Sequence, residues 1–453
     1  MGETLGSETV STKILRIAKL ARENPTMVLT TLAHNIDIEW MREAYARTRK
    51  DGAPGIDGQS AEEYAMNLDE NLASLLERAK SGTYQAPAVR RVYIPKGTGG
   101  TETRPIGIPT FEDKVLQRAV VMVLEPIYEQ MFLDCSYAFR PNRSQHQALE
   151  ALREKLMGMN GGIVLEIDIR KFFDNVDRGH MRELVSQRVR DGVLLRLIGK
   201  WLNAGVQESG VTSYPEAGTP QGGVVSPLLS NVYLHYVLDE WFAKEVKPRL
   251  AGRAFLIRFA DDAVIVFDNE KDAQRVLEVL PKRCGQYGLT LHPEKTRKVP
   301  FGRPPKGGPK GNGKPPGDET GPGSFDMLGF THYWARSRKG NWVIKRKTAK
   351  DRVRRVIKRI AHWCRRHRHE PVREQRKHLS AMLRGHYNYY GVTCNLPALR
   401  QVYQATRSAW KHWLDRRSSR ARMIWTKMEE LLKRYPLPGP NIVRSYFPTV
   451  ANP

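Results

Sequence analysis

Apolar residues recur at helical spacing along most of the chain, and short apolar runs replace this pattern at a few places. The helical spacing predicts helices within residues 12–50, with a break at Pro25, and over 60–80, 111–133, 144–157, 177–204, 227–247 and 271–287. β-Prone runs predict strands at 88–94, at 163–168 and on both sides of residues 260–262. The expected fold class is α+β, with a small antiparallel sheet under helices.

Two acidic residues occupy the connection between the last two β-prone runs. Residues 254–258 are mostly apolar, Asp261 and Asp262 follow Ala260, and residues 264–267 are again apolar, which predicts a hairpin with two carboxylates at its tip. Adjacent carboxylates in a buried hairpin repel one another and lose hydration, so such a pair persists mainly where cations neutralise it. The alternative for an isolated pair is a solvated turn, because Asp is a common turn former.

A third acid, Asp168, ends the run at 164–168, and two aromatic residues follow it closely. A carboxylate at a strand end and two more on a hairpin form a set that can hold two Mg²⁺ ions, since hard cations take oxygen ligands. Two such ions clamp the attacking and leaving oxygens of an in-line phosphoryl displacement. The predicted reaction is therefore nucleotidyl transfer.

A Gly- and Pro-rich turn lies between these acidic segments. Residues 218–229 read GTPQGGVVSPLL, in which glycine lets the backbone pass close to a ligand and Ser226-Pro227 begins the next helix. The turn alone is weak evidence. In the order Asp168, Pro-Gln-Gly turn, Phe-Ala-Asp-Asp, the combination resembles the palm of a reverse transcriptase, and in particular the group II intron reverse transcriptase–maturase family.

The resemblance extends over nearly the whole chain. Residues 104–110 and 137–144 resemble the family's fingers motifs, 288–296 and 325–330 its last palm motifs, and 52–58 the N-terminal extension of non-retroviral members. Two positions depart from the family pattern, which more often has Tyr at Phe259 and often Asn at His292. The missing hydroxyl at Phe259 removes no metal ligand, so this departure bears on fidelity rather than on activity.

The resemblance implies a right-hand polymerase fold and gives roles to single residues. The expected catalytic acids are Asp168, Asp261 and Asp262, and the expected metal positions for two Mg²⁺ ions are these three with Ile169. The residues expected around the incoming nucleotide are Lys96, Arg104, Phe173, Gln221 and Lys295.

The expected nucleotide residues have different roles. Lys96 and Arg104 would clamp the triphosphate, because fixed positive charge offsets the phosphates and Arg can bind in bidentate fashion. Phe173 would pack under the incoming sugar and exclude a 2′-hydroxyl. Gln221 would line the same pocket, and Lys295 would lie near the primer end or the acids. The alternatives are a core position for Phe173 and solvated surface positions for the others.

Composition agrees with a nucleic-acid enzyme. The 453 residues carry a formal net charge of +26, which suits a polyanionic partner and predicts salt-dependent binding, although a ribosomal protein would share this feature. Four cysteines without a Cys-x-x-Cys pair suit a reducing cytosol. The sequence shows neither a signal peptide nor an apolar run of membrane length, so a cytoplasmic protein without a membrane partner is expected.

Three parts are expected along the chain: an N-terminal extension over 1–80, fingers and palm over 81–345, and a helical thumb, also called the maturase or X domain, over 346–453. Residues 302–324 are dominated by Gly, Pro and Lys, which predicts a flexible basic loop. An inter-domain linker is the alternative, but the palm-like motif at 325–330 favours a loop inserted within the palm.

Beyond Thr348, the sequence places apolar residues on one helical face and Arg or Lys on the others. A basic helical bundle with surface aromatic residues would bind an RNA–DNA duplex and also structured RNA. The alternative places Trp363, Trp410 and Trp413 in the core. The candidate nucleic-acid-binding residues are Arg354, Arg355, Arg359, Trp410, Arg416 and Arg417.

Cys364, His367 and His369 raise the question of a zinc site. Helical residues two apart point to different faces, and no second ligand pair follows at a usual spacing. Zinc is therefore not expected, and the three residues are expected to face a duplex or solvent. The sequence also lacks the Cys-rich endonuclease module of many group II intron proteins, so second-strand cleavage is not expected.

Three function classes follow. The first is an intron-encoded polymerase that extends a DNA primer on an RNA template from deoxynucleoside triphosphates, helps its structured intron RNA to splice, and acts at a DNA target. The second is a domesticated, defence-associated or CRISPR-associated polymerase of the same fold. The third is an RNA-binding splicing factor without polymerase activity, against which the three acids argue. A flanking intron RNA in the genome would separate the first two.

Overall fold

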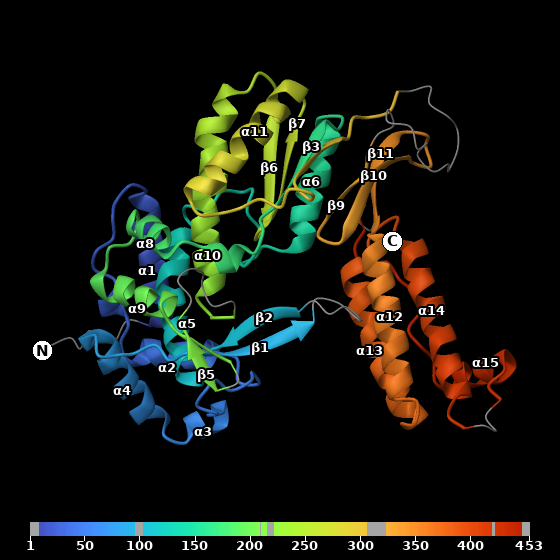
Figure 1. The fold of residues 1–453 in the computed structure, drawn as a ribbon, viewed down its shortest axis with the longest axis horizontal. Coiled ribbons are helices and arrows are strands. Elements are labelled where there is room, and N and C mark those ends of the chain that lie inside the picture. The colour runs from blue at the N-terminus through green and yellow to red at the C-terminus, as the bar shows by residue number, and fades with distance from the viewer. Residues whose placement is uncertain are drawn as a thin grey trace, which may run out of the picture. The chain divides into compact units, whose positions relative to one another are not determined.

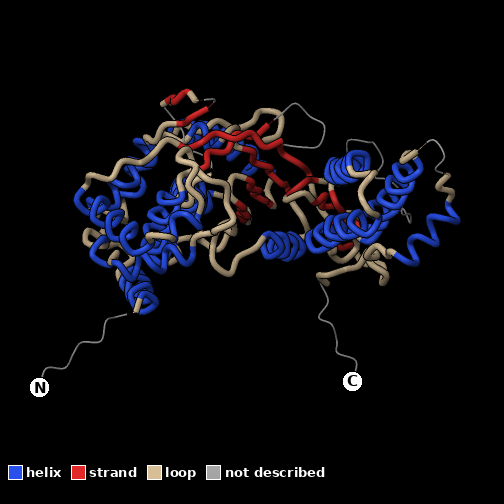
Figure 2. The backbone as a smooth tube through the Cα atoms, turned by 90° about the horizontal axis from the view of Figure 1, so that it is seen from below, coloured by secondary structure: helices blue, strands red, loops and turns tan. Residues whose placement is uncertain are grey.

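The computed structural model describes residues 9–95, 103–208, 210–214, 222–305, 323–418 and 422–445, and Figure 1 labels its elements. The chain forms two compact units. Unit 1 comprises Met1–Ile94, Arg104–Leu156 and Ile163–Lys298, and unit 2 comprises Pro95–Thr103, Met157–Gly162 and Val299–Pro453. Helices predominate and short strands form small sheets among them (Figure 2), so the expected α+β class is confirmed.

Unit 1 is mainly helical. Its helices are α1 (Val10–Glu23), α2 (Ile38–Arg47), α3 (Ala61–Ala65), α4 (Leu68–Ser81), α5 (Phe111–Tyr128), α6 (Gln145–Gly158), α7 (Phe172–Asn175), α8 (Arg178–Ser186), α9 (Gly192–Leu202), α10 (Ser226–Leu234) and α11 (Glu270–Gln286). Two 3-10 turns are η1 (Ala33–Asn35) and η4 (Lys247–Arg249), and two π-helical segments, η2 (His235–Glu240) and η3 (Phe242–Val246), follow α10.

Helix α5 lies at the centre of the unit 1 core. Thr110 caps its N-terminus by accepting a hydrogen bond from the Asp113 backbone N–H at 3.2 Å. Most residues of α5 are buried, and helices α1 and α2 pack against it. The fully buried Trp40 of α2 donates its indole N–H to the Ala119 carbonyl at 3.0 Å. The N-terminal helices therefore share the core of unit 1.

One four-stranded sheet has the order β6-β7-β3-β8. Its strands are β6 (Ala254–Phe259), β7 (Asp262–Phe267), β3 (Ile163–Asp168) and β8 (Arg297–Pro300). Strand β7 pairs antiparallel with both β6 and β3, and its residues 263–267 are buried on both faces. Helix α11 packs against β3 and β7, which agrees with the expected sheet under helices.

A second four-stranded sheet has the order β2-β1-β4-β5. Strands β1 (Val89–Pro95) and β4 (Val206–Glu208) are parallel, and β4 pairs antiparallel with β5 (Val211–Ser213). The outer strand β2 (Thr103–Ile108) carries Arg104. The sequence predicted only β1 of this sheet, because strands of three residues, such as β4 and β5, leave too short a pattern.

Unit 2 combines a small antiparallel sheet with a helical bundle. The sheet has the order β11-β10-β9, with β9 (Phe325–Met327), β10 (Phe330–Arg336) and β11 (Trp342–Thr348). The helices are α12 (Lys350–Arg366), α13 (Val372–Tyr390), α14 (Leu396–Asp415) and α15 (Trp425–Arg434). None of the helices in the described part of the chain has both the length and the apolar character that crossing a membrane requires.

The observed elements refine several expected ones. The helix expected over 60–80 is divided into α3 and α4, and that over 177–204 into α8 and α9. The second division is stabilised by Asp191, which caps α9 and whose Oδ2 also accepts the backbone N–H groups of Leu32 and Ala33 at 2.7 and 2.8 Å. The helix expected over 227–247 becomes π-helical after Leu234.

The expected boundary at 345/346 falls inside β11. This strand is fastened to the bundle within unit 2, because Asn395 Oδ1 accepts the Thr348 N–H and Asn395 Nδ2 donates to Thr348 Oγ1, both at 2.8 Å. The rings of Phe330 and Tyr390 also pack with centroids 5.1 Å apart. Of the segment expected to be a flexible loop, residues 306–322 lie outside the described residues.

Candidate active site

The three predicted catalytic acids come from the end of β3 and from the β6–β7 hairpin. Asp168, the last residue of β3, is the cross-strand partner of Asp262, the first residue of β7, and Asp262 in turn pairs with Phe259. Directly opposed residues point to the same face of an antiparallel sheet. Asp168 and Asp262 are therefore neighbours on one face, and Asp261 immediately precedes Asp262 in the β6–β7 turn. Hydrophobic residues of β3, β6 and β7 fix this register.

Burial and nearby charges act on the pKa of the Asp261 carboxyl group in opposite directions. Burial raises its pKa, and the negative charge of Asp168 raises it further, whereas the positive charges of Arg104 and Arg258 oppose the shift. Clustered carboxylates that lose hydration favour either protonation or a bound cation. Because all the side-chain donors are carboxylate oxygens, the set suits a hard divalent ion.

The carboxylate oxygens of the three acids suit divalent ions, but these side chains do not by themselves surround a metal position. Among the described residues, no group of three or more His, Cys, Asp and Glu side chains is arranged to hold a metal ion. Mg²⁺ usually takes only one or two carboxylates and completes its shell with substrate phosphates and water. The residues therefore fit a site that substrate would complete.

Lys295 lies beside the acids. Its Nζ is 3.3 Å from Asp168 Oδ2, and the segment that carries it is tied to the end of β3. The His292 N–H donates to the Asp168 carbonyl at 2.8 Å, and the Arg170 N–H donates to the Thr290 carbonyl at 2.8 Å. The structure thus brings Lys295 to the acids across 127 residues of sequence.

Arg104 and Gly222, the last residue of the Pro-Gln-Gly turn, both lie at strand β2 of unit 1. Arg104, on β2, is close enough to Asp261 to lower that carboxyl's pKa. Gly222 has a φ of 124°, and a Cβ there would lie 2.3 Å from the Gly107 carbonyl oxygen of β2. Only glycine allows this close approach. Lys96 and Gln221 lie outside the described residues.

Phe173 and Ile169 flank the end of β3. Phe173, in α7, is half-buried against the core, and its ring meets that of the buried Phe172 edge-on at a centroid distance of 5.4 Å. Ile169 is buried and forms an isolated antiparallel bridge with Leu291. This placement tests neither the predicted role of Phe173 at the sugar nor that of Ile169 at the metal ions.

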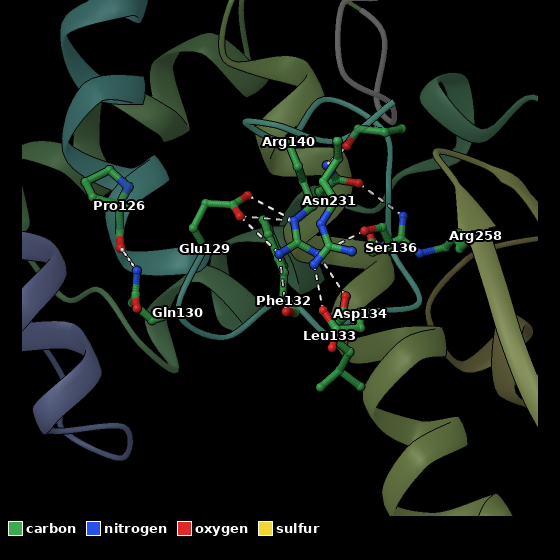
Figure 3. A network of polar contacts seen from close by, with 12 residues as sticks. Pro126, Glu129, Gln130, Phe132, Leu133, Asp134, Ser136, Arg140, Asn231 and Arg258 are labelled. Atoms are coloured by element: carbon green, nitrogen blue, oxygen red, sulfur yellow. Dashed lines mark hydrogen bonds and ion pairs between the residues drawn. The ribbon is translucent and has the colours of Figure 1, made fainter. Parts of the chain in front are cut away.

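Sequence reasoning missed a polar network behind the hairpin. Arg258 of β6 is fully buried and contacts Ser136 and Asn231 (Figure 3). It also contacts the carbonyl of Ala260, the residue that immediately precedes Asp261. The available signal was an Arg within the otherwise apolar run 254–259, a place where a charge is expensive unless it is paired.

A second polar group supports the chain just after the Pro-Gln-Gly turn. The buried Gln117 of α5 accepts the Val225 N–H on its Oε1 at 3.1 Å and donates from Nε2 to Asp113 Oδ2 at 3.0 Å. Asp113 also accepts from the Tyr84 hydroxyl and the Trp201 indole N–H, at 2.6 and 2.7 Å. Distant segments of unit 1 are joined at this one carboxylate.

Helix α12 of unit 2 carries three of the residues that were predicted to bind nucleic acid. Val353, Val356 and Ile360 of α12 are buried, whereas Arg354 and Arg359 are exposed. Arg355 forms an ion pair with Asp351.

The other predicted contacts of unit 2 lie in α14 and just beyond it. The exposed Arg416 packs over the Trp413 ring, 5.8 Å from its centroid. Arg417 donates to the backbone carbonyls of Arg368 and Glu370, so part of its guanidinium has a structural role.

Two predictions in this bundle were wrong. Trp410 is fully buried and donates its indole N–H to Gln375 Oε1 at 2.8 Å, so it belongs to the core and cannot contact nucleic acid. Cys364 is likewise buried in the bundle core, where burial raises the pKa of its thiol to about 12. It faces neither duplex nor solvent, because its position falls on the apolar stripe of α12.

The acidic hairpin beside an Asp-ended strand, with Lys295 and Arg104 near the acids, is an arrangement typical of enzymes that transfer nucleotidyl groups. Residues 94–332 match the family model described as reverse transcriptase (RNA-dependent DNA polymerase). This match covers more than half of the chain, which therefore belongs to the reverse transcriptase family. The prediction of an RNA-directed DNA polymerase is confirmed at the level of the family.

Relatives narrow the position within that family. The chain is 33% identical over 321 residues to protein YkfC of Escherichia coli, a match covering 62% of this chain and 82% of YkfC. It is 38% identical over 224 residues to the group II intron-encoded protein LtrA of Lactococcus lactis, covering 49% of this chain but only 36% of LtrA.

A third relative is the nuclear intron maturase 2, mitochondrial, of Arabidopsis thaliana, 29% identical over 241 residues, which cover 45% of this chain and 31% of that protein. The predicted kinship with group II intron reverse transcriptases and maturases is thus confirmed.

Proposed function

We propose that the chain extends a DNA primer on an RNA template and assists the splicing and mobility of a group II intron RNA. The observation that carries the polymerase part is the β-sheet register, which places Asp168 directly opposite Asp262 and one residue from Asp261. Membership of the reverse transcriptase family supports the same chemistry. The intron part is supported by the similarity to LtrA and to an intron maturase.

In the proposed mechanism, Asp168, Asp261 and Asp262, together with Ile169, would hold two Mg²⁺ ions. When bound, these ions would neutralise charge at the attacking and leaving oxygens of the phosphoryl transfer. Lys295, which pairs with Asp168, would reduce the electrostatic repulsion among the carboxylates before substrate binds. The chain's own contribution is to hold these groups in fixed positions, so that little reorganisation is needed during reaction.

Substrate selection is proposed to depend on residues around the acids. Arg104 and Lys96 would bind the triphosphate, Arg104 in bidentate fashion. Gln221 would line the nucleotide pocket, and the close approach of Gly222 to β2 supports a shared pocket for the turn and Arg104. Phe173 would lie under the sugar and exclude a 2′-hydroxyl, which its position five residues after Asp168 and its half-buried ring support.

The parts of a right-hand polymerase are proposed to map onto the fold as follows. The β6-β7-β3-β8 sheet and its helices would be the palm, and the sheet containing β1 and β2 would belong to the fingers. The helices of unit 2 would form the thumb and maturase domain over 346–453, after an N-terminal extension over 1–80 and fingers and palm over 81–345.

Maturase activity is proposed to use the basic face of α12 together with the N-terminal extension. Exposed Arg354 and Arg359, and Arg416 over Trp413, offer charge and stacking surface to structured RNA. Arg355, paired with Asp351, and Arg417, bonded to carbonyls, would contribute less. A domesticated, defence-associated or CRISPR-associated polymerase of the same family is the second candidate, and a flanking intron RNA in the genome would argue against it.

The decisive test of the polymerase assignment is Asp261→Ala. Primer extension on an RNA template should be abolished, while template affinity, measured by fluorescence anisotropy, should stay nearly unchanged. Glu278→Ala is the matched control, because it removes an exposed acid of α11 that is not proposed to bind metal. Extension by Asp261→Ala at close to the wild-type rate would refute the assignment.

A further inference from the structure

The fully buried guanidinium of Arg258 uses every donor that it has. An Arg side chain carries five N–H groups. Nε and Nη2 donate to the two carboxylate oxygens of Asp239 at 2.7 and 2.6 Å, and Nη2 also donates to Ser136 Oγ at 2.7 Å. Nη1 donates to Asn231 Oδ1 and to the Ala260 carbonyl, both at 3.1 Å.

The charge of Arg258 is compensated within the same network. Both the Arg258 and Asp239 side chains are completely buried. Burial alone would lower the pKa of Arg258, but the Asp239 carboxylate raises it above its ordinary value. A buried ion pair is maintained only when its geometry is good and the remaining donors are satisfied. Asp239 supplies the compensating negative charge and accepts two of the five N–H groups of Arg258. The other three N–H groups are therefore available for neutral acceptors.

One of these neutral acceptors is the turn that precedes Asp261. Ala260 has a φ of 56°, in the left-handed region that residues with a Cβ rarely adopt. The hydrogen bond from Arg258 to the Ala260 carbonyl fixes the orientation of the peptide group that joins Ala260 to Asp261. The conformation of this turn determines where the Asp261 carboxylate points relative to Asp168.

Backbone hydrogen bonds also connect Arg258 to the segment 135–140 of unit 1. The backbone N–H of Arg258 donates to the Cys135 carbonyl at 2.7 Å, and the backbone N–H of Tyr137 donates to the Arg258 carbonyl at 3.0 Å. Asn231 Nδ2 donates to the Ala138 carbonyl at 2.7 Å.

The support continues past residue 138. Arg140 is bound to Glu129 through paired contacts of 3.0–3.2 Å and to the Leu133 carbonyl at 2.8 Å (Figure 3). The segment 135–140 is therefore anchored at several points besides Arg258.

We propose that Arg258 is a positioning residue that holds Ala260 in its left-handed conformation and thereby places Asp261 for catalysis. The inference rests on the proposed polymerase function, since it concerns the arrangement of the same acids. Arg258 touches neither metal nor substrate in this role. It acts through the Ala260 peptide group, with Asp239, Ser136 and Asn231 holding the guanidinium in place.

The main test variant is Arg258→Lys. Lysine keeps the charge opposite Asp239 but has three donors instead of five, so it cannot satisfy all the acceptors. Changes in residues that orient metal ligands typically reduce metal affinity or activity about 10–100-fold. We expect a loss of this size in kcat for primer extension and in the affinity for Tb³⁺, measured by luminescence, with little change in KM for deoxynucleotides or in primer–template affinity.

Ala260→Gly in the Arg258→Lys background separates positioning from general stabilisation. Glycine adopts positive φ without the penalty of a Cβ. If Arg258 maintains the turn conformation, Ala260→Gly should therefore restore about one tenth to one half of the lost Tb³⁺ affinity and of the lost rate. Loss of core packing would not be repaired by glycine. Failure of glycine to restore either quantity would overturn the proposal.

Arg188→Lys is the matched control. Arg188 is also a buried Arg of unit 1, but it donates to backbone carbonyls, including those of Asn24 and Ala21, at 2.8 and 2.7 Å. This variant should lower the melting temperature without the selective loss of Tb³⁺ affinity. Equal loss in both Lys variants at matched folded fraction would show that Arg258 has only a structural role.

Ser136→Ala provides a milder perturbation in case Arg258→Lys does not fold. It removes one neutral acceptor and leaves the ion pair intact, and it should reduce Tb³⁺ affinity and kcat together. Wild-type values of both in a folded Ser136→Ala protein would contradict the proposal. Tb³⁺ binding needs no turnover, so it tests positioning even if the wild-type chain fails to extend a primer, a result that would reject the proposed function instead.

Discussion

At the scale of single residues, charged side chains from three different strands of unit 1 influence the pKa of Asp261. Asp168 raises the Asp261 pKa, whereas Arg104 and Arg258 lower it. Arg258 is completely buried and committed to internal acceptors, but Arg104 lies on an outer strand with an exposed side chain. Arg104 is therefore the residue of this pair whose side chain is accessible to a triphosphate.

Arg104→Ala should raise KM for deoxynucleoside triphosphates more than it lowers kcat. Hydrogen bonds to charged groups contribute enough that losing a bidentate contact should change KM by about 10–100-fold. Steady-state extension across a nucleotide titration measures both constants. Arg249→Ala, which removes an exposed Arg in η4, is the control. Unaltered KM and kcat in Arg104→Ala would exclude it from the triphosphate site.

Phe173→Ala should raise ribonucleotide incorporation relative to deoxyribonucleotide incorporation. Removing the ring opens space beneath the sugar for a 2′-hydroxyl, provided that Phe173 lies under the nucleotide. The ratio of kcat/KM for the two nucleotides is the measurement. Phe172→Leu, which alters the buried neighbour, should lower stability without changing that ratio. A ratio that stays constant in Phe173→Ala would make Phe173 a core residue only.

At the scale of elements, α5 organises unit 1 through a buried carboxylate. Burial raises the pKa of Asp113 to about 6, although hydrogen bonds from Tyr84, Trp201 and Gln117 oppose the shift. The carboxyl group thus binds its proton more tightly in the folded chain than in the unfolded chain. Ionisation of Asp113 must then cost stability as pH rises from about 4 through 6.

Asp113→Asn should flatten the pH dependence of unfolding in this interval. A shift from 3.8 to about 6 corresponds to roughly 3 kcal/mol of stability lost by the wild-type chain between about pH 3 and 7. Chemical denaturation at several pH values gives the slopes. The absolute stability of the variant will also change, because an amide cannot accept all three hydrogen bonds, so the difference in slope is the relevant quantity. Parallel slopes would contradict the expected shift.

At the scale of the whole molecule, the net charge of +26 makes binding to nucleic acid strongly salt-dependent. This charge is distributed over both units, so total charge alone does not locate the RNA surface. The helix α12 concentrates it, because its buried stripe of Val353, Val356, Ile360 and Cys364 leaves the remaining faces to Arg and Lys. An RNA surface on α12 makes a specific prediction for salt titrations.

Changing Arg354, Arg355 and Arg359 together to Ala should weaken intron RNA binding and reduce its salt slope. Each lost phosphate contact lowers the log–log slope by about 0.7–0.9, and Arg355 should contribute least because it is paired with Asp351. The control changes Lys271, Arg275 and Lys282, three exposed cations of α11, to Ala.

The same variants should be compared in splicing at low Mg²⁺ and in extension of a short primer–template. If extension falls while intron binding and splicing remain unchanged, the bundle acts as a thumb only, and the maturase proposal fails.

The sequence determined the features that depend on local pattern. Helical periodicity located α5, α6, α11 and α12, because a buried stripe repeats every three to four residues whatever it packs against. The sequence also predicted the acidic hairpin, because two apolar strands joined by a connection as short as the Asp261 turn can pair only as a hairpin. Motif order was sufficient to identify the family, which comparison confirmed.

Tertiary structure alone decided which distant residues meet. The pairing of Arg258 with Asp239, the hydrogen bond from Val225 to Gln117 and the burial of Trp410 all depend on how helices and strands pack across many residues of sequence. A helical pattern shows that one face is apolar, but it does not show which of several aromatic or charged residues at its edge is covered by a neighbour. Burial and pairing at such edge positions are set by packing, which local periodicity does not encode.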